Sequence, residues 1–232
     1  MHIPSRILLA ASLTLLLTTG RAAMAADDKD RVLRKLDAAA ANFHSTSADF
    51  QYDAVTTDPI PDTDTQKGTV YYERTGKNFR MAAHIRENDR KPVVKVYSYA
   101  NGEFKLFEGG NTNQVTSYSK AGQFESYLML GFGASGKDLE DKWEIKYLGP
   151  ETLDGVKTEK LELVAKDAAV RKNIPKVTVW MDVERGISLK QVFDEGPGQY
   201  RVCVYFNIKM NQSLPADAFT FKTDRQTTFV KR

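Results

Sequence analysis

The sequence predicts a mainly β (α+β) protein built on one large, curved antiparallel sheet with few helices. Residues 200–211, Y-R-V-C-V-Y-F-N-I-K-M-N, alternate apolar and polar side chains over about twice the usual strand length. Further segments with a period of two succeed one another through short turns from Ser45 onward. Helical periodicity is confined to short stretches, so most inward apolar positions belong to strands.

Residues 1–25 have the features of a cleavable export signal. Arg6 supplies positive charge, residues 7–17 form a short apolar run, and Ala23-Met24-Ala25 is a small-x-small cleavage site. The apolar run is too short to span a bilayer as a retained helix. We therefore expect residues 26–232 to form a single exported domain.

Composition and charge narrow the class of protein. The chain has 33 Lys and Arg against 30 Asp and Glu, without a concentrated basic stripe, which argues against nucleic-acid binding. Cys203 is the single cysteine, so an internal disulfide is excluded and no cysteine follows the cleavage site to carry a lipid. We expect a soluble monomer, with Cys203 on the outer face of its strand.

The first half of the chain predicts one helix and then a meander. Leu33, Leu36, Ala40 and Phe43 follow helical spacing and predict an amphipathic helix over residues 31–43. Alternation resumes after Ser45, and an exposed loop with two prolines is expected at 57–64. The strands expected here cover residues 45–54, 65–74, 79–85, 92–99, 103–108 and 114–119. Six strands joined by short turns predict an antiparallel meander.

Residues 123–132, Q-F-E-S-Y-L-M-L-G-F, interrupt this pattern because they are apolar on nearly every side. They are either a short buried helix or a movable helix lying over an apolar cavity. A second helical turn is expected at 135–141, and a third at 217–219. The later strands are expected at residues 143–148, 158–165, 176–182, 187–194, 200–211 and 219–221. The total is about eleven strands and two or three helices.

Residues that could carry catalysis are scarce. Beyond the signal only His44 and His84 remain, and neither belongs to a nucleophile motif. One cysteine and two histidines make a zinc site improbable, and the glycines form no phosphate-binding loop. We therefore predict a protein that is not an enzyme and that needs no metal or cofactor. The surplus of inward apolar positions instead predicts a container for lipid.

Several motifs follow one another along the chain: K-L-D and N-F-H within residues 35–44, Ala48-Asp49-Phe50, G-T-V-Y-Y-E-R at 68–74, Y-A-N-G at 99–102 and L-P-A-D-A-F-T-F at 214–221. In this order and spacing they resemble the LolA family of periplasmic carriers of outer-membrane lipoproteins. The resemblance covers most of residues 26–232. One departure is Thr75, which stands where the family has a proline.

The resemblance implies a strongly curved antiparallel half-barrel with a helical lid. Its cavity would shield the acyl chains of lipoproteins during transit from inner to outer membrane. The implied partners are the lipoprotein cargo, an inner-membrane lipoprotein-releasing ABC transporter and an outer-membrane acceptor. The alternatives are a periplasmic carrier of another acylated lipid and a lipid- or lipoprotein-sensing adaptor module.

Two groups of residues follow as candidates for the site. On residues 200–211 the expected inward face includes Val202, Val204, Phe206 and Ile208. The other residues expected to line the acyl cavity are Phe50, Tyr71, Leu106, Tyr127, Leu128, Leu161 and Leu163. The residues expected at the lid contact are Leu36, Arg74, Phe124 and Leu130. Arg74 matches the family arginine that holds the closed form.

Overall fold

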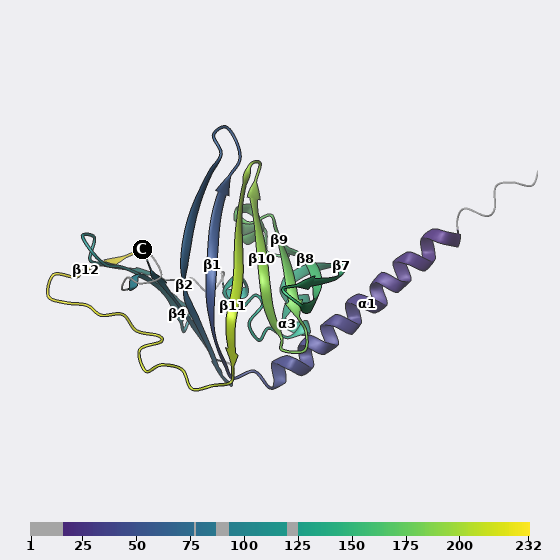
Figure 1. Ribbon diagram of the computed structural model, residues 1–232, viewed down its shortest axis with the longest axis horizontal. Helices are drawn as coiled ribbons and strands as arrows, with labels where there is room; N and C mark the ends of the chain where they lie inside the picture. The colour runs from purple at the N-terminus through teal and green to yellow at the C-terminus, as the bar shows by residue number, and fades with distance from the viewer. Residues whose placement is uncertain (1–15, 77, 87–92, 120–124) are drawn as a thin grey trace, which may run out of the picture.

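The computed structural model describes residues 16–76, 78–86, 93–119 and 125–232. Twelve strands form one open sheet in the order β12-β6-β5-β4-β3-β2-β1-β11-β10-β9-β8-β7 (Figure 1). The strands are β1 Ser45–Thr56, β2 Asp62–Thr75, β3 Asn78–Arg86, β4 Val93–Ala100, β5 Glu103–Glu108, β6 Gln114–Tyr118, β7 Trp143–Leu153, β8 Val156–Ala165, β9 Lys176–Asp182, β10 Ile187–Gly196, β11 Gln199–Met210 and β12 Thr228–Lys231. The helices are α1 Leu16–Ala41, α2 Glu125–Leu128, α3 Gly136–Lys142 and α4 Ala168–Asn173.

The sheet consists of two antiparallel meanders, β1–β6 and β7–β11, joined where β11 pairs with β1. It is curved and does not close into a barrel, which confirms the predicted fold class. The six-strand meander is confirmed as well. β12 is the exception to the antiparallel pattern, because it pairs with β6 in parallel.

Some predicted boundaries are wrong. β1 and β2 extend further than expected, since residues 62–64 pair with residues 54–56 and leave a shorter loop. The closing strand is β12 rather than residues 219–221, whereas the turn expected at 217–219 is confirmed by the bond from Ala218 N to Pro215 O (3.0 Å). Helix α4 was missed. Asp167 caps it by accepting bonds from Ala169 N and Val170 N.

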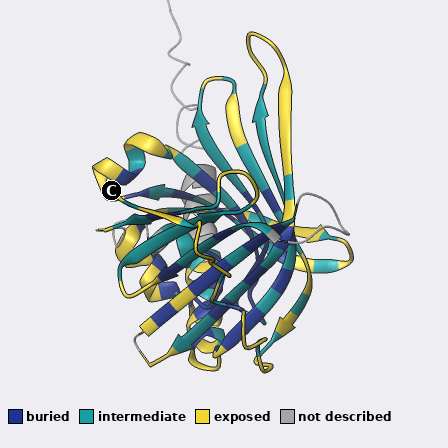
Figure 2. Ribbon diagram, turned by 90° about the vertical axis from the view of Figure 1, so that its left-hand side faces the viewer, coloured by how far each residue is buried: buried dark blue, intermediate teal, exposed yellow. Residues whose placement is uncertain are grey.

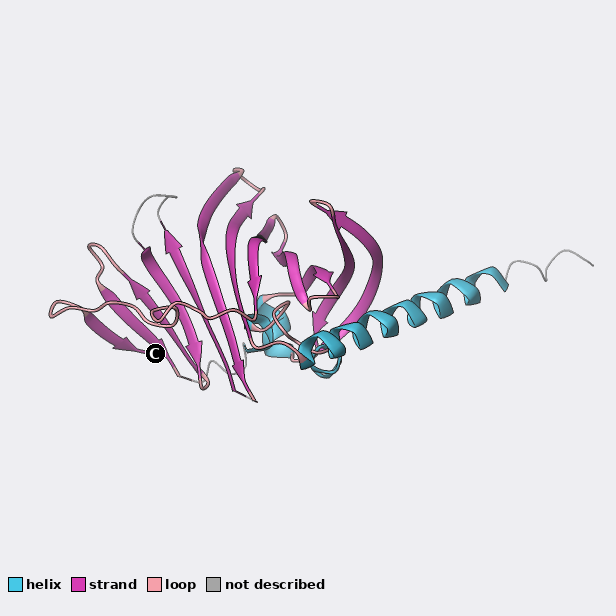
Figure 3. Ribbon diagram, turned by 60° about the horizontal axis from the view of Figure 1, so that its bottom comes forward, coloured by secondary structure: helices cyan, strands magenta, loops and turns pink. Residues whose placement is uncertain are grey.

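The helices cover one side of the sheet. α1 runs from Leu16 to Ala41, longer than expected, and its first turns extend away from the sheet (Figures 1 and 3). Its last turns pack on the concave face through Val32, Leu33 and Leu36. None of the helices in the described residues is long and apolar enough to cross a membrane. The export signal at 1–25 stays a prediction.

Two apolar clusters divide the concave face. One lies under α1, α3 and α4 and includes Leu161, Leu163 and Val179, which are fully buried. The other includes Phe50, Tyr72 and Phe132 between β1, β2 and the segment after α2. Buried residues gather in the lower part of the sheet, while the tips of the long hairpins are less buried (Figure 2).

The opposite, convex face carries a C-terminal strap, defined as residues 211–227. Ala218 of the strap is fully buried, and the Arg80 guanidinium lies 4.0 Å from the centre of the Phe219 ring. The Phe221 ring stacks on Phe107 at 5.2 Å. The strap thus covers the outer face of the first meander before β12 joins the edge of the sheet.

Candidate functional site

An apolar pocket of about 360 Å³ opens on the concave face between β1–β5, α2 and β11. Its aromatic lining consists of Phe50, Tyr52, Tyr72, Tyr97, Phe104 and Tyr205. Its aliphatic and sulfur-containing lining consists of Val70, Met81, Ala83, Ile85, Leu128 and Cys203. The polar contributions come from Gln66 and Arg201. Ligand pockets commonly combine such an apolar wall with a few polar groups.

The register of β1 and β11 explains which side chains face the pocket. Phe50 lies opposite Tyr205, and Tyr52 lies opposite Cys203. Directly paired residues of an antiparallel ladder share a face, so Cys203 and Tyr205 point inward with the apolar residues of β1. Cys203 is only 6% exposed.

The predicted inward face of β11 is therefore wrong over its first half. Val202 and Val204 lie on the convex face, and Phe206, opposite Asp49, is 46% exposed. The expectation that Cys203 faces outward is wrong for the same reason. A register shift between Ser47 and Asp49 marks the cause.

At this shift β11 has a β-bulge centred on Asn207, whose φ is 51°. The extra residue reverses the parity of the strand, so Ile208 and Met210 return to the concave side and pack against the apolar cluster that includes Phe50, Tyr72 and Phe132. The alternation of apolar and polar residues in the sequence thus continues across Asn207, whereas the alternation of side chains between the two faces of the sheet is interrupted there.

The base of the pocket is fixed by the segment that follows α2. Phe132 is fully buried, stacks on Tyr72 with ring centres 4.1 Å apart, and meets Tyr205 edge-on at 4.8 Å. Gln191 Nε2 donates to Leu130 O (2.5 Å), and Ser188 N donates to Gly131 O (2.7 Å). Residues 130 and 131 are therefore held against β10, but they lie in turns: the helix expected over residues 123–132 is limited, in the described part of the chain, to α2 at Glu125–Leu128.

Burial disfavours the ionised forms of one cysteine and two tyrosines in the lining. It raises the pKa of Cys203 to about 12 and raises the pKa values of Tyr72 and Tyr205 well above their ordinary range. The Tyr205 hydroxyl donates to Gln191 Oε1 (3.2 Å). At neutral pH these three side chains therefore carry no negative charge, which suits an apolar occupant.

The structure separates the other predicted cavity residues. Phe50 and Leu128 line the pocket. Leu106 pairs with Tyr97 and shares its face, but it lies outside the lining. The remaining three residues, Tyr127, Leu161 and Leu163, belong to the apolar cluster under α1, α3 and α4. In this cluster Tyr127 packs edge-on against Trp143, with ring centres 4.8 Å apart.

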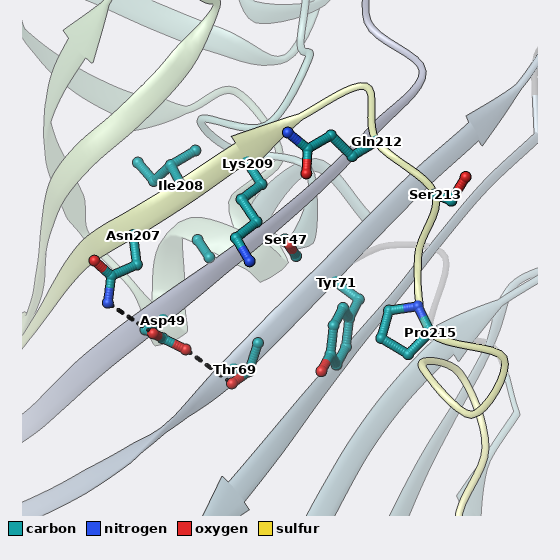
Figure 4. Close-up of a pocket in the computed structure, with 11 residues that line it drawn as sticks. Ser47, Asp49, Thr69, Tyr71, Asn207, Ile208, Lys209, Gln212, Ser213 and Pro215 are labelled. Carbon is teal, nitrogen blue, oxygen red and sulfur yellow. Dashed lines mark hydrogen bonds between the residues drawn. The ribbon is translucent and has the colours of Figure 1, made fainter.

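Tyr71 was expected to line the acyl cavity, but it lies on the convex face. There it borders a polar cleft of about 640 Å³ between β1, β2, β11 and the start of the strap (Figure 4). Asp49 lies in this cleft and accepts bonds from Asn207 Nδ2 (3.0 Å) and Thr69 Oγ1 (2.9 Å). The tyrosine ring meets His84 edge-on at 5.2 Å. This cleft is too polar to shield an acyl chain.

The predicted lid contacts are core residues in part. Leu36 and Leu130 are buried together in the cluster under α1. Arg74 lies with its guanidinium 5.9 Å from the Phe43 ring, and its backbone N–H donates to His44 O (2.8 Å). Phe124 lies outside the described residues.

The two histidines lie in different settings. His44 is exposed, whereas His84 is buried beneath the strap, where desolvation lowers its pKa. In the described part of the chain, no three His, Cys, Asp or Glu residues are grouped to hold a metal ion.

The lining residues that sequence reasoning missed come mainly from β2–β4. Val70 and Tyr72 alternate with polar or outward neighbours, and so do Met81, Ala83 and Ile85. Their period of two was visible, but it does not show which face of the sheet is concave. The first meander could have been weighted more heavily as the pocket wall because helices are fewer there.

Comparisons with known proteins concern mainly the fold. No family model matches the chain. An uncharacterized protein of Methanocaldococcus jannaschii is 26% identical over 192 residues, which is 83% of this chain and 50% of that protein. The chain thus spans half the length of this relative.

Solved structures share the architecture at low identity. An uncharacterized conserved protein from Thermus thermophilus superposes with a TM-score of 0.54 at 11% identity, covering 88% of this chain and 99% of that one. MucB superposes with a TM-score of 0.52 at 12% identity, covering 84% and 63%. A LolA superfamily protein from Nitrosomonas europaea has a TM-score of 0.40 at 16% identity, covering 83% and 97%. At these identities the likeness concerns the fold alone, and it rests on the structures from Thermus thermophilus and of MucB, whose TM-scores exceed 0.5.

Proposed function

We propose that this protein is a periplasmic carrier that shields the acyl chains of lipoproteins between the inner and outer membranes. The observation that carries the proposal is the apolar, largely aromatic pocket on the concave face of an open sheet. It combines a fixed base with an accessible volume of about 360 Å³. In this role the protein binds and releases its cargo and performs no chemistry on it.

The pocket volume suits a single acyl chain. If a methylene group occupies a volume similar to a water molecule's share of the liquid, about 30 Å³, the pocket holds on the order of a dozen methylene groups. Each methylene removed from water contributes about 0.8 kcal/mol, so exposing such a chain costs roughly 10 kcal/mol. A chain of this kind needs a carrier to cross an aqueous compartment.

Release requires that the carrier's affinity for its cargo be only slightly higher than the affinities of its donor and acceptor. We propose an inner-membrane lipoprotein-releasing ABC transporter as donor and an outer-membrane protein as acceptor. Each partner would shift the balance between bound and free carrier by its own differential affinity. The export signal at 1–25 would deliver the protein to the periplasm.

The test is to identify what the protein carries. The full chain is expressed in a bacterium with two membranes, purified from its periplasm, and analysed by mass spectrometry for bound acylated molecules. The proposal predicts acylated lipoprotein in the wild-type sample and its loss in Ala83→Glu, which places a charge in the pocket. Recovery of a non-protein acyl lipid instead would identify a lipid carrier, and recovery of no acylated molecule would refute a carrier role.

A further inference from the structure

Among the described residues that line the pocket, Arg201 is the one cationic side chain. It lies opposite Ala54 on β1 and Phe193 on β10, with its guanidinium carbon 5.6 Å from the centre of the Phe193 ring. Its Nη2 forms an ion pair with Glu195, and its Nη1 donates to the Tyr52 hydroxyl (3.4 Å). Both Nη nitrogens of the guanidinium therefore have a partner.

The guanidinium carries five N–H donors, and these two contacts use one on each Nη nitrogen. Arg201 Nε is buried and has no hydrogen-bond partner among the described residues. Buried donors in native proteins are nearly always satisfied, and leaving one unpaired is costly. An oxygen atom of an occupant cannot reach the buried Nε, but the Arg201 side chain as a whole is 29% exposed and lines the pocket, so an occupant can accept a bond from the Nη nitrogens.

The pocket is polar at one end and aromatic at the other. Gln66 pairs across the strands with Tyr52, so these two residues and Arg201 place the polar groups together. The opposite end is formed by Tyr72 and Tyr205 around the buried Phe132. This gradient matches an acyl chain whose methyl end enters the aromatic base and whose oxygen-bearing head stays at the polar end.

Glu195 decides which kind of head fits. Its carboxylate already pairs with Arg201, so the polar end carries no net positive charge. A free carboxylate would be repelled by Glu195, whereas an uncharged carbonyl oxygen would accept a bond without competing for the ion pair. The pair therefore favours a neutral ester or amide over a fatty acid.

We propose that Arg201 binds the carbonyl oxygen of an acyl ester or amide at the mouth of the pocket, so that the protein selects acylated molecules over free fatty acids. This rests on the proposed carrier function and names its class of ligand. The acyl groups of a lipoprotein and those of a membrane lipid share this chemistry.

The test uses the full chain and a neutral fluorescent reporter, N-phenyl-1-naphthylamine, displaced by three ligands with one chain length: methyl dodecanoate, dodecanoate and dodecane. The wild type is expected to bind the ester more tightly than the carboxylate. Arg201→Met, which keeps an apolar stem, should weaken ester binding about tenfold, the usual scale for a hydrogen bond to a charged donor, and leave dodecane unchanged. Arg201→Lys keeps the charge without the planar fork and should lose ester affinity similarly. Glu195→Gln should improve dodecanoate binding.

The outcomes separate the two proposals. Equal ester affinity in the wild type and Arg201→Met, with reporter uptake intact, would overturn the role of Arg201 alone. Tighter wild-type binding of dodecanoate than of the ester would overturn the stated ligand class. If none of the three ligands displaced the reporter from the wild type, the carrier function itself would fall. Monodisperse, reporter-binding variants show that folding is preserved.

Discussion

The two halves of the concave face differ in whether their inward side chains are covered. Over β7–β9 the inward side chains form a closed core, in which Leu161, Leu163 and Val179 are fully buried. Over β1–β5 and β11 the inward side chains line an open pocket. Both halves use the same alternation of apolar and polar residues, so alternation alone does not separate a core from a cavity.

The covering helices make the difference. α1, α3 and α4 bring apolar side chains to the filled half, including Leu36, Leu139 and Val170. In the pocket half the helical contribution to the lining, within the described residues, comes from Leu128 of α2. A sheet face becomes a core only where other elements supply enough apolar volume to fill it.

The largest expected effect concerns the chemistry of the pocket half. Burial raises the pKa of Cys203 to about 12, so at pH 8 its thiolate should be roughly a thousandfold scarcer than that of an ordinary exposed cysteine. Iodoacetamide should alkylate it correspondingly slowly in the folded protein, and rapidly in urea. Because the neutral thiol is the form favoured by the fold, its contribution to stability should be complete below pH 9 and decline above it. Alkylation of the folded protein at the rate measured in urea would contradict this account.

A truncation in each half should separate stability from binding. Leu161→Ala removes a fully buried side chain from the closed core and should lower the free energy of unfolding by about 2–5 kcal/mol. Phe104→Ala removes a half-buried ring from the pocket wall and should cost less stability while changing acyl-probe affinity. Urea titration measures the first effect and probe binding the second. Equal stability losses would show that the pocket half is packed like the core.

The smallest effect concerns the segment that forms the pocket base. Gly131 and Gly155 share a φ of 81°, but only at Gly131 would an added Cβ meet neighbouring atoms, those of Ser188 and Gln191. Gly131→Ala should therefore be less stable than Gly155→Ala by about 1–3 kcal/mol, the usual cost of overpacking. Urea unfolding of the two variants measures this difference. A similar loss in both would mean that backbone strain alone sets the cost and that the base is not tightly packed.

The sequence was informative where local pattern decides structure. The meander β1–β6 follows from alternation and short turns, and the helical turn expected at 135–141 is α3, which Ser135 caps in the structure. The inward face of β11 could not be predicted, because the bulge at Asn207 arises from pairing with β1 and breaks the parity of the strand. The closing strand could not be predicted either, because β12 is short and gains its ladder only by reaching the edge at β6.

The same limit applies to the candidate site. Phe50 and Leu128 were found because their apolar character coincides with the concave side. Tyr71 was placed wrongly because its neighbour Tyr72 is equally aromatic and takes the inward position. Arg201 could not be singled out from the sequence, since its role depends on Tyr52 and Glu195 across two strand pairs.

The central claim is that the concave pocket, and not the convex face of the same strands, binds acyl chains. The most direct measurement is uptake of a fluorescent acyl probe by two variants that place a glutamate on opposite faces, Ala83→Glu in the pocket and Val204→Glu on the convex face. Ala83→Phe, which fills the pocket without a charge, guards against a loss caused by misfolding. The account predicts that uptake is lost in both Ala83 variants and retained in Val204→Glu. Retained uptake in the Ala83 variants together with loss in Val204→Glu would place the acyl chain on the other face and contradict it.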